Sequence, residues 1–383
     1  MTRREILVFA IAILVLPLGL SAQEYQPDFT QRYVWLPVKS ADALPAQLKA
    51  AAAAAGYRLV AAPYGEAKRL NLIMEKVATP PDLYEYEVFD PCRDTMTGKE
   101  VARRDEAYGH GFRVLGWALI GCRDIGFDYE GTLMGVGAIQ IMEKRPGQPR
   151  SQTEYQVLQT SRTSTLEKEI NQAGAEGYRP IGLFIVLSDY YALLERTVGE
   201  SRQTTEQAAD LGSSPRFKLL VSMRLATVEK ELRQAAASGY RALMTAAKES
   251  PALLTTGQMV LILLEKTETS GYDYVVVGSK DPSDLRQKLQ QAAAKGFQLM
   301  PQTLVRRIGL TAMLTLLMEK RPGAPCCYDY EVVSVSAKDP AGVQKEITLA
   351  VEKGLRPLGL WWKLGREDIV ILEKVPPQAT TGQ

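Results

Sequence analysis

Residues 272–297 read YDYVVVGSKDPSDLRQKLQQAAAKGF, and this stretch contains the pattern that decides the fold. Its opening, 272–277, is rich in aromatic and β-branched residues, which favour a β-strand. The Asp-Pro pair at 281–282 is typical of a helix start, because Asp caps free backbone N–H groups and Pro suits the first helical position. Leu285 and Leu289 lie four residues apart and predict one apolar stripe along a helix.

Two short signatures show that this unit occurs six times. The first is a Gly followed by an aromatic residue or Leu, at Gly56, Gly111, Gly177, Gly239, Gly296 and Gly354. The second is an apolar run that ends in Glu and a basic residue, at Glu75, Glu143, Glu195, Glu265, Glu319 and Glu373. The two signatures alternate strictly along the chain. We expect each Gly to end a helix in the left-handed conformation, which other residues adopt at a steric cost.

Two further strands are expected between each Gly and the following Glu. The last strand of a unit is apolar on both faces, as in 261–264 and 369–372, which suits a central position in the sheet. The sequence therefore predicts an α+β protein of six βαββ repeats, each an antiparallel sheet of strand order 2-3-1 with one helix across a face. The expected repeats span 30–77, 83–145, 153–197, 217–267, 271–321 and 327–375.

The repeat resembles the small bacterial βαββ domains of unknown function, which open with Tyr-x-Tyr-x-Val-Val and close a helix with Gly-aromatic. Tyr328-Asp-Tyr-Glu-Val-Val333 and Gly296-Phe297 carry this resemblance, which covers nearly all of the chain after its first residues. The resemblance implies a fold and no activity.

The chain ends and one linker stand outside the repeats. Arg3 and Arg4, the apolar run 6–16 and the small residues before 23 are typical of a secretory signal, so we expect cleavage after Ala22. The rest of the chain has no run of spanning length, so no membrane span is expected after cleavage. The polar segment 198–216 is expected to be a mobile linker, where cleavage leaves two three-repeat fragments, and 376–383 is expected to be a disordered tail.

The charge balance argues against a nucleic-acid partner. Lys and Arg total 46 and Asp and Glu total 44, with both signs interspersed and no basic stripe. Export permits disulfides. Cys92 and Cys122 should emerge at the same end of the sheet of repeat 2 and are expected to form one, which leaves Cys326 and Cys327 over.

Repeat 2 departs most from the pattern and contains the candidate ligand site. Its hairpin loop, 121–131, is enlarged, and its acidic side chains could bind a cation such as calcium, although they are as readily explained as solvated loop residues. The only histidine lies at a helix C-terminus, where contact with the last carbonyl groups explains it, and a lone His does not form a clustered zinc site. The candidate residues are Tyr108, His110, Trp117, Asp124, Asp128 and Glu130.

Other recurrent residues have structural explanations. The basic residue two positions after the signature Gly should face the Glu that ends strand three, as cross-strand neighbours. The expected pairs are Arg58–Glu75, Arg113–Glu143, Arg179–Glu195, Arg241–Glu265 and Arg356–Glu373. The aromatic pairs 190–191 and 361–362 should each leave one ring partly exposed, and contact between repeats is the favoured use of it.

We therefore expect an exported, periplasmic or secreted, non-enzymatic repeat protein that acts by binding or scaffolding a protein or a small molecule. The alternative is an enzyme of hydrolase type, or a sensor of small ligands or cations, sited on the loops of repeat 2. No catalytic residue, metal site or cofactor is predicted. One repeat of about 55 residues buries little alone, so the repeats should pack on one another, in a row or as pairs.

Overall fold

The computed structural model of the chain contains six antiparallel sheets in tandem, each built from one βαββ repeat. In every sheet the third strand of the repeat lies between the first and the second, as in β1-β3-β2 and β20-β22-β21, so the predicted α+β fold and strand order are confirmed. The structure describes residues 25–38, 43–62, 70–77, 83–89, 106–116, 120–121, 126–127, 133–134, 138–145, 153–186, 189–198, 215–222, 225–249, 258–301, 305–307, 313–324, 328–335, 339–364 and 367–374.

The helices and strands follow the order expected from the sequence. Repeat 1 contains β1 (Tyr33–Val38), α1 (Leu44–Ala55), β2 (Tyr57–Ala61) and β3 (Leu70–Lys76). Repeat 2 contains β4 (Glu85–Phe89), β5 (Arg113–Val114), β6 (Ile120–Gly121), β7 (Gly126–Phe127), β8 (Leu133–Met134) and β9 (Ala138–Lys144). Repeat 3 contains β10 (Thr153–Thr160), α3 (Thr163–Ala175), β11 (Arg179–Val186) and β12 (Asp189–Thr197). Repeat 4 contains β13 (Phe217–Ser222), α5 (Leu225–Ala237), β14 (Tyr240–Glu249) and β15 (Gln258–Lys266). Repeat 5 contains β16 (Asp273–Ser279), α6 (Pro282–Ala293), β17 (Gln298–Leu299), β18 (Val305–Arg307) and β19 (Met313–Lys320). Repeat 6 contains β20 (Asp329–Val335), α7 (Pro340–Glu352), β21 (Arg356–Leu364) and β22 (Glu367–Lys374).

The signature glycines end the helices as the sequence predicts. All six have a positive φ, between 70° and 91°. The N–H of the residue after the Gly commonly bonds back into the last helical turn, as Tyr178 does to the carbonyl of Ala173 and Phe297 to that of Ala292. A left-handed residue followed by this bond is the Schellman helix end, which satisfies carbonyl groups that the helix itself leaves free.

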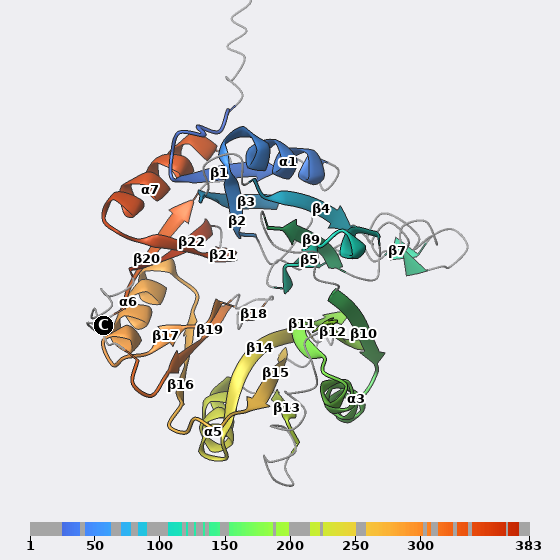
Figure 1. The fold of residues 1–383 in the computed structure, drawn as a ribbon. Helices are drawn as coiled ribbons and strands as arrows, with labels where there is room; N and C mark the ends of the chain where they lie inside the picture. The colour runs from blue at the N-terminus through green and yellow to red at the C-terminus, as the bar shows by residue number, and fades with distance from the viewer. Residues whose placement is uncertain are drawn as a thin grey trace, which may run out of the picture.

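The six repeats close into a ring (Figure 1). Along the chain, helices contact the first strand of the following repeat, α1 on β4, α3 on β13, α5 on β16 and α6 on β20. The last helix continues the series, because α7 contacts β1 and β21 contacts β2. The repeats thus form a row whose last member packs on its first, and the labelled helices lie at the outside of the ring.

Each junction between repeats has its own apolar core. Six clusters of buried side chains lie at the six junctions, and each combines a repeat with the one that follows it. The central strand serves two cores, because Leu261 and Leu263 of β15 face repeat 3 while Ile262 and Leu264 face away from it. At ring closure, Trp35 of β1 is 1 % exposed and lies in one cluster with Val343 and Ile347 of α7. An end repeat of an open array would instead need a polar outer face.

Repeats 3 and 4 pack together as the other neighbours do, although the segment between them is long and polar. Phe217 and Leu219 of β13 share a core with Leu166 and Ile170 of α3, and β11 contacts β14. The segment 199–214 lies outside the described residues, so its predicted mobility stays a prediction.

Cleavage between 199 and 214 should therefore leave one particle. The two halves of the nicked chain meet at two apolar junctions, between repeats 3 and 4 and between repeats 6 and 1. Limited proteolysis followed by size-exclusion chromatography should give two fragments on a denaturing gel but one peak of unchanged mass. Two separately eluting fragments would contradict the ring.

Repeat 2 is the least regular unit. Residues 106–109 form a helical turn before Gly111, where the sequence predicts a helix end, and residues 90–105 lie outside the described residues. Its enlarged hairpin contains a short ladder of its own, in which Gly126 of β7 pairs with Met134 of β8. No helix in the described part of the chain is long and apolar enough to cross a membrane.

Candidate functional site

At two junctions the edge of strand one, which has no neighbouring strand, is hydrogen-bonded by a polar side chain from the helix of the preceding repeat in the ring. Strand one lies at one edge of its sheet, so alternate N–H and C=O groups lack a ladder partner. Asn171 of α3 accepts from the N–H of Phe217 at 2.8 Å and donates to its carbonyl at 2.7 Å. At ring closure Gln344 of α7 accepts from the N–H of Trp35 at 2.7 Å and donates to the carbonyl of Tyr33 at 2.8 Å.

The other edge, strand two, is capped by a tyrosine of the following repeat. The N–H of Leu59 donates to the hydroxyl of Tyr86 at 2.7 Å, and the N–H of Ala242 donates to that of Tyr274 at 2.9 Å. Leu299 with Tyr330 and Val114 with Tyr155 repeat the arrangement at 2.8 and 3.0 Å. In every case the donor is the third residue after the signature Gly, so one rule holds at four junctions.

Proline occupies this donor position at the other two junctions. Pro180 and Pro357 lie three residues after Gly177 and Gly354 and have no backbone N–H. Opposite Pro180 the tyrosine is replaced by Phe217, so the donor and the hydroxyl are missing together. Opposite Pro357 the hydroxyl of Tyr33 donates to Glu75 at 2.7 Å.

The Glu that ends strand three forms ion pairs with arginine side chains at the junctions. The predicted cross-strand register is confirmed for all five Arg–Glu pairs. Two of these pairs also form ion pairs between their side chains: Arg179 Nη2 lies 2.5 Å from Glu195 Oε1, and Arg356 Nη2 lies 3.1 Å from Glu373 Oε2. The predicted ion pairs Arg58–Glu75 and Arg241–Glu265 are wrong.

Those two arginines reach the next repeat instead. Arg58 binds Glu143 at 3.3 Å and Arg241 binds Glu319 at 2.9 Å. Their own sheet partners are occupied, since Arg32 binds Glu75 at 3.1 Å and Arg216 binds Glu265 at 2.8 Å.

These junction groups keep fixed charges. The hydroxyl of Tyr274 donates to Glu319 at 3.1 Å, and burial together with that carboxylate raises the pKa of Tyr274 well above its ordinary value. The hydrogen bonds to Glu319 raise the pKa of Arg241. The tyrosines therefore stay neutral and Arg241 stays charged, which suits a structural contact better than proton transfer.

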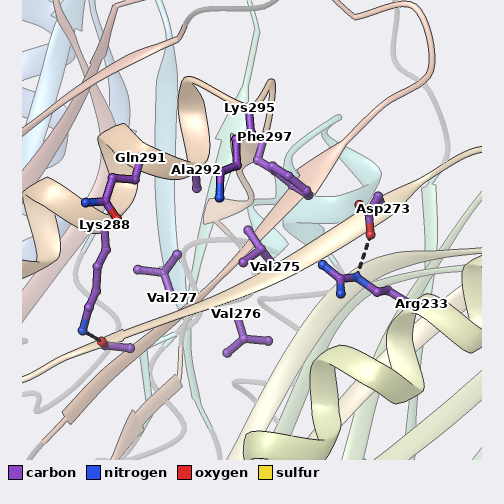
Figure 2. A pocket seen from close by; sticks show the side chains of 11 residues that line it. Arg233, Asp273, Val275, Val276, Val277, Lys288, Gln291, Ala292, Lys295 and Phe297 are labelled. Atoms are coloured by element: carbon purple, nitrogen blue, oxygen red, sulfur yellow. Dashed lines mark hydrogen bonds and ion pairs between the residues drawn. The ribbon is translucent and has the colours of Figure 1, made fainter.

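A groove of about 550 Å³ lies along the outer edge of β16, between α5 and α6 (Figure 2). Val275 and Val277 point toward α6, and Val276 points to the opposite side of the strand. Phe297 lies near Val275 and adds to the apolar lining. Lys288 and Gln291 of α6 form the rim together with Lys295, which lies in the turn after this helix.

Most charges around this groove are already paired. Arg233 of α5 binds Asp273 at 2.8 Å, and Lys288 donates to the carbonyl of Gly278 at 2.8 Å. Lys288 also meets Asp284 at 2.8 Å, and the hydrogen bond to Lys288, together with Ser279, lowers the pKa of Asp284. Lys295 is exposed and has no ion-pair partner among the described residues, so the groove keeps one unbalanced positive charge.

Two of the six sequence-predicted site residues, Tyr108 and His110, lie in the described part of the chain. Tyr108 is 8 % exposed and its ring lies 4.2 Å from that of Tyr155, so it packs in the junction of repeats 2 and 3. His110 is exposed at the helix end, where its backbone N–H donates to the backbone carbonyls of Glu106 and Ala107. Trp117, Asp124, Asp128, Glu130 and all four cysteines lie outside the described residues, as do residues 1–24 and 375–383.

The aromatic pair of repeat 3 follows the prediction. Tyr191 is buried and stacks on Phe184 with centroids 5.0 Å apart, whereas Tyr190 is half-buried. The hydroxyl of Tyr190 reaches the sulfur of Met259 in repeat 4 at 3.5 Å, so the partly exposed ring serves contact between repeats. The side chains of Trp361 and Trp362 lie outside what the structure describes.

The groove itself was not predicted from the sequence. Its residues come from two repeats, and the distance along the chain between Arg233 and Lys295 gives no sign that they share a surface. Within the described residues no three His, Cys, Asp or Glu side chains are grouped to hold a metal ion.

No protein-family model matches the chain, and no curated protein is significantly similar to it.

Proposed function

We propose that this chain is an exported, non-enzymatic ring that acts by binding or scaffolding another molecule. The groove beside β16 carries this proposal, because it offers a strand edge, an apolar lining and an unpaired Lys295 on one surface. Small sites of this kind combine an apolar lining with a few convergent polar groups. The ring supports the role, since each junction fixes its neighbours through an apolar core.

The likeness of the repeats to small bacterial βαββ domains fits this proposal, because those domains have no assigned activity. Export rests on the signal-like residues 1–22, and N-terminal sequencing of the exported protein should begin at Gln23.

A thermal-shift screen of residues 23–383 tests the binding role. The ligands are divalent cations, cell-wall fragments and short peptides. At least one class should raise the melting temperature, and Lys295→Glu should abolish that shift without changing the melting temperature of the free protein. Replacement of 123–130 by a short Gly-Ser turn should leave the shift intact.

Two results would contradict the proposal. One is a shift that is lost with the 123–130 replacement and kept in Lys295→Glu, which would place the site on repeat 2. The other is chemical conversion of the ligand during incubation, lost in His110→Ala, which would make the chain an enzyme.

A further inference from the structure

The segment before β1 supplies a side chain that hydrogen-bonds to the exposed edge of this strand. Tyr25 precedes the first repeat, and its hydroxyl donates to the carbonyl of Trp35 at 3.1 Å and to Gln344 Oε1 at 3.3 Å. Its ring packs against the apolar core between repeats 6 and 1. Burial raises the pKa of Tyr25 to about 12, so it remains a hydrogen-bond donor at neutral pH.

Val276 of β16 occupies the position of Trp35. In register, Tyr33 faces Glu75 and Tyr274 faces Glu319, so the residues two positions later, Trp35 and Val276, are equivalent. The N–H of Val276 donates to Glu229 of α5 at 3.1 Å, as that of Trp35 donates to Gln344 of α7.

The carbonyl of Val276 must point to the same side as its N–H, because both groups of one residue share a side in an antiparallel strand. It has no partner in the described part of the chain. The groove follows this edge of β16. Its apolar lining lies on the side of the strand that faces α6, whereas the ring of Tyr25 packs on the side of β1 that faces α7.

The lining specifies what could enter. Val275, Val277 and Phe297 suit an aromatic ring, and the Val276 carbonyl accepts one hydrogen bond. Lys295 supplies an unpaired positive charge at the rim, so an acidic residue next to the aromatic one would be complementary to it. The chain's own Glu24-Tyr25 has this chemistry.

We propose that the groove between α5 and α6 binds a short extended segment of a partner protein that carries a tyrosine beside an acidic residue. The tyrosine hydroxyl donates to the Val276 carbonyl, and the acidic side chain meets Lys295. This inference rests on the proposed binding role and adds the chemical class of the partner.

Fluorescence anisotropy with a labelled peptide of residues 23–31, QEYQPDFTQ, tests the inference on the chain 23–383. The peptide should bind, and Lys295→Glu should weaken binding about fivefold or more, because attraction becomes repulsion. Lys353→Glu is the matched control, because Lys353 precedes the signature Gly354 after α7 as Lys295 precedes Gly296 after α6. This variant should bind the peptide as the unmodified chain does. Gln291→Trp, which fills the groove by bulk, should also abolish binding.

A peptide with Phe in place of Tyr should bind about fivefold more weakly through loss of one hydrogen bond. Absence of binding to the unmodified chain, or equal effects of Lys295→Glu and Lys353→Glu, would overturn the inference. If another ligand from the screen still depends on Lys295, the inference alone fails and the binding role stands.

Discussion

Truncation of Glu319 to alanine should lower the free energy of unfolding by about 2–4 kcal/mol, measured by urea denaturation of the chain 23–383. The Glu319 side chain is 1 % exposed and accepts from Arg241, Tyr274 and Arg321. Its loss leaves a buried hydroxyl and two guanidinium groups without their carboxylate. The arginines keep some contact with water, which keeps the loss below the upper limit for a buried ion pair.

Glu265→Ala is the matched control for this prediction. Glu265 ends strand three of repeat 4 as Glu319 does in repeat 5, but its side chain is 31 % exposed and pairs with the similarly exposed Arg216. Phe217 replaces the tyrosine there, so no hydroxyl loses a partner. The control should cost about 1 kcal/mol or less. Equal losses in the two variants would show that the Glu319 contacts do not hold repeats 4 and 5 together.

Truncation of Trp35 to alanine should have the second large effect, a loss of about 3–5 kcal/mol in the free energy of unfolding. Trp35 is 1 % exposed and packs on α7 of the last repeat, so its removal opens a cavity at ring closure. Val157 occupies the same position in β10, two residues after Tyr155, and is 47 % exposed. Val157→Ala should therefore change stability by about 0.5 kcal/mol or less. A small loss for Trp35→Ala would mean that repeat 6 does not cover this side chain.

The repeat itself could be predicted because each of its signals is local. Gly296 requires a left-handed helix end, and the apolar run 369–372 requires a central strand, whatever the rest of the chain does. The paired appearance of Pro180 and Phe217 was also a sequence signal for a contact between repeats. It becomes interpretable only when strand two of one repeat is known to face strand one of the next.

The contacts between repeats could not be predicted from spacing alone. Arg58 and Glu75 are cross-strand neighbours, yet Arg58 binds Glu143, because an arginine side chain can reach either of two adjacent sheets. Ring closure had one clue, since β1 has Val34 and Leu36 on one face and Tyr33 and Trp35 on the other. A strand that is apolar on both faces needs a cover on both sides. The groove beside β16 depends on the relative position of two helices from different repeats, which no local pattern encodes.

Quenching of Trp35 fluorescence by acrylamide tests the closed ring most directly. The variant Trp117→Phe, Trp361→Phe, Trp362→Phe retains Trp35 as its single tryptophan. In the ring, α7 covers this side chain, so emission should be blue-shifted and quenching should be far weaker than in the urea-unfolded chain. Quenching as strong in the folded protein as in the unfolded one would show that repeat 1 ends an open array and would contradict the ring.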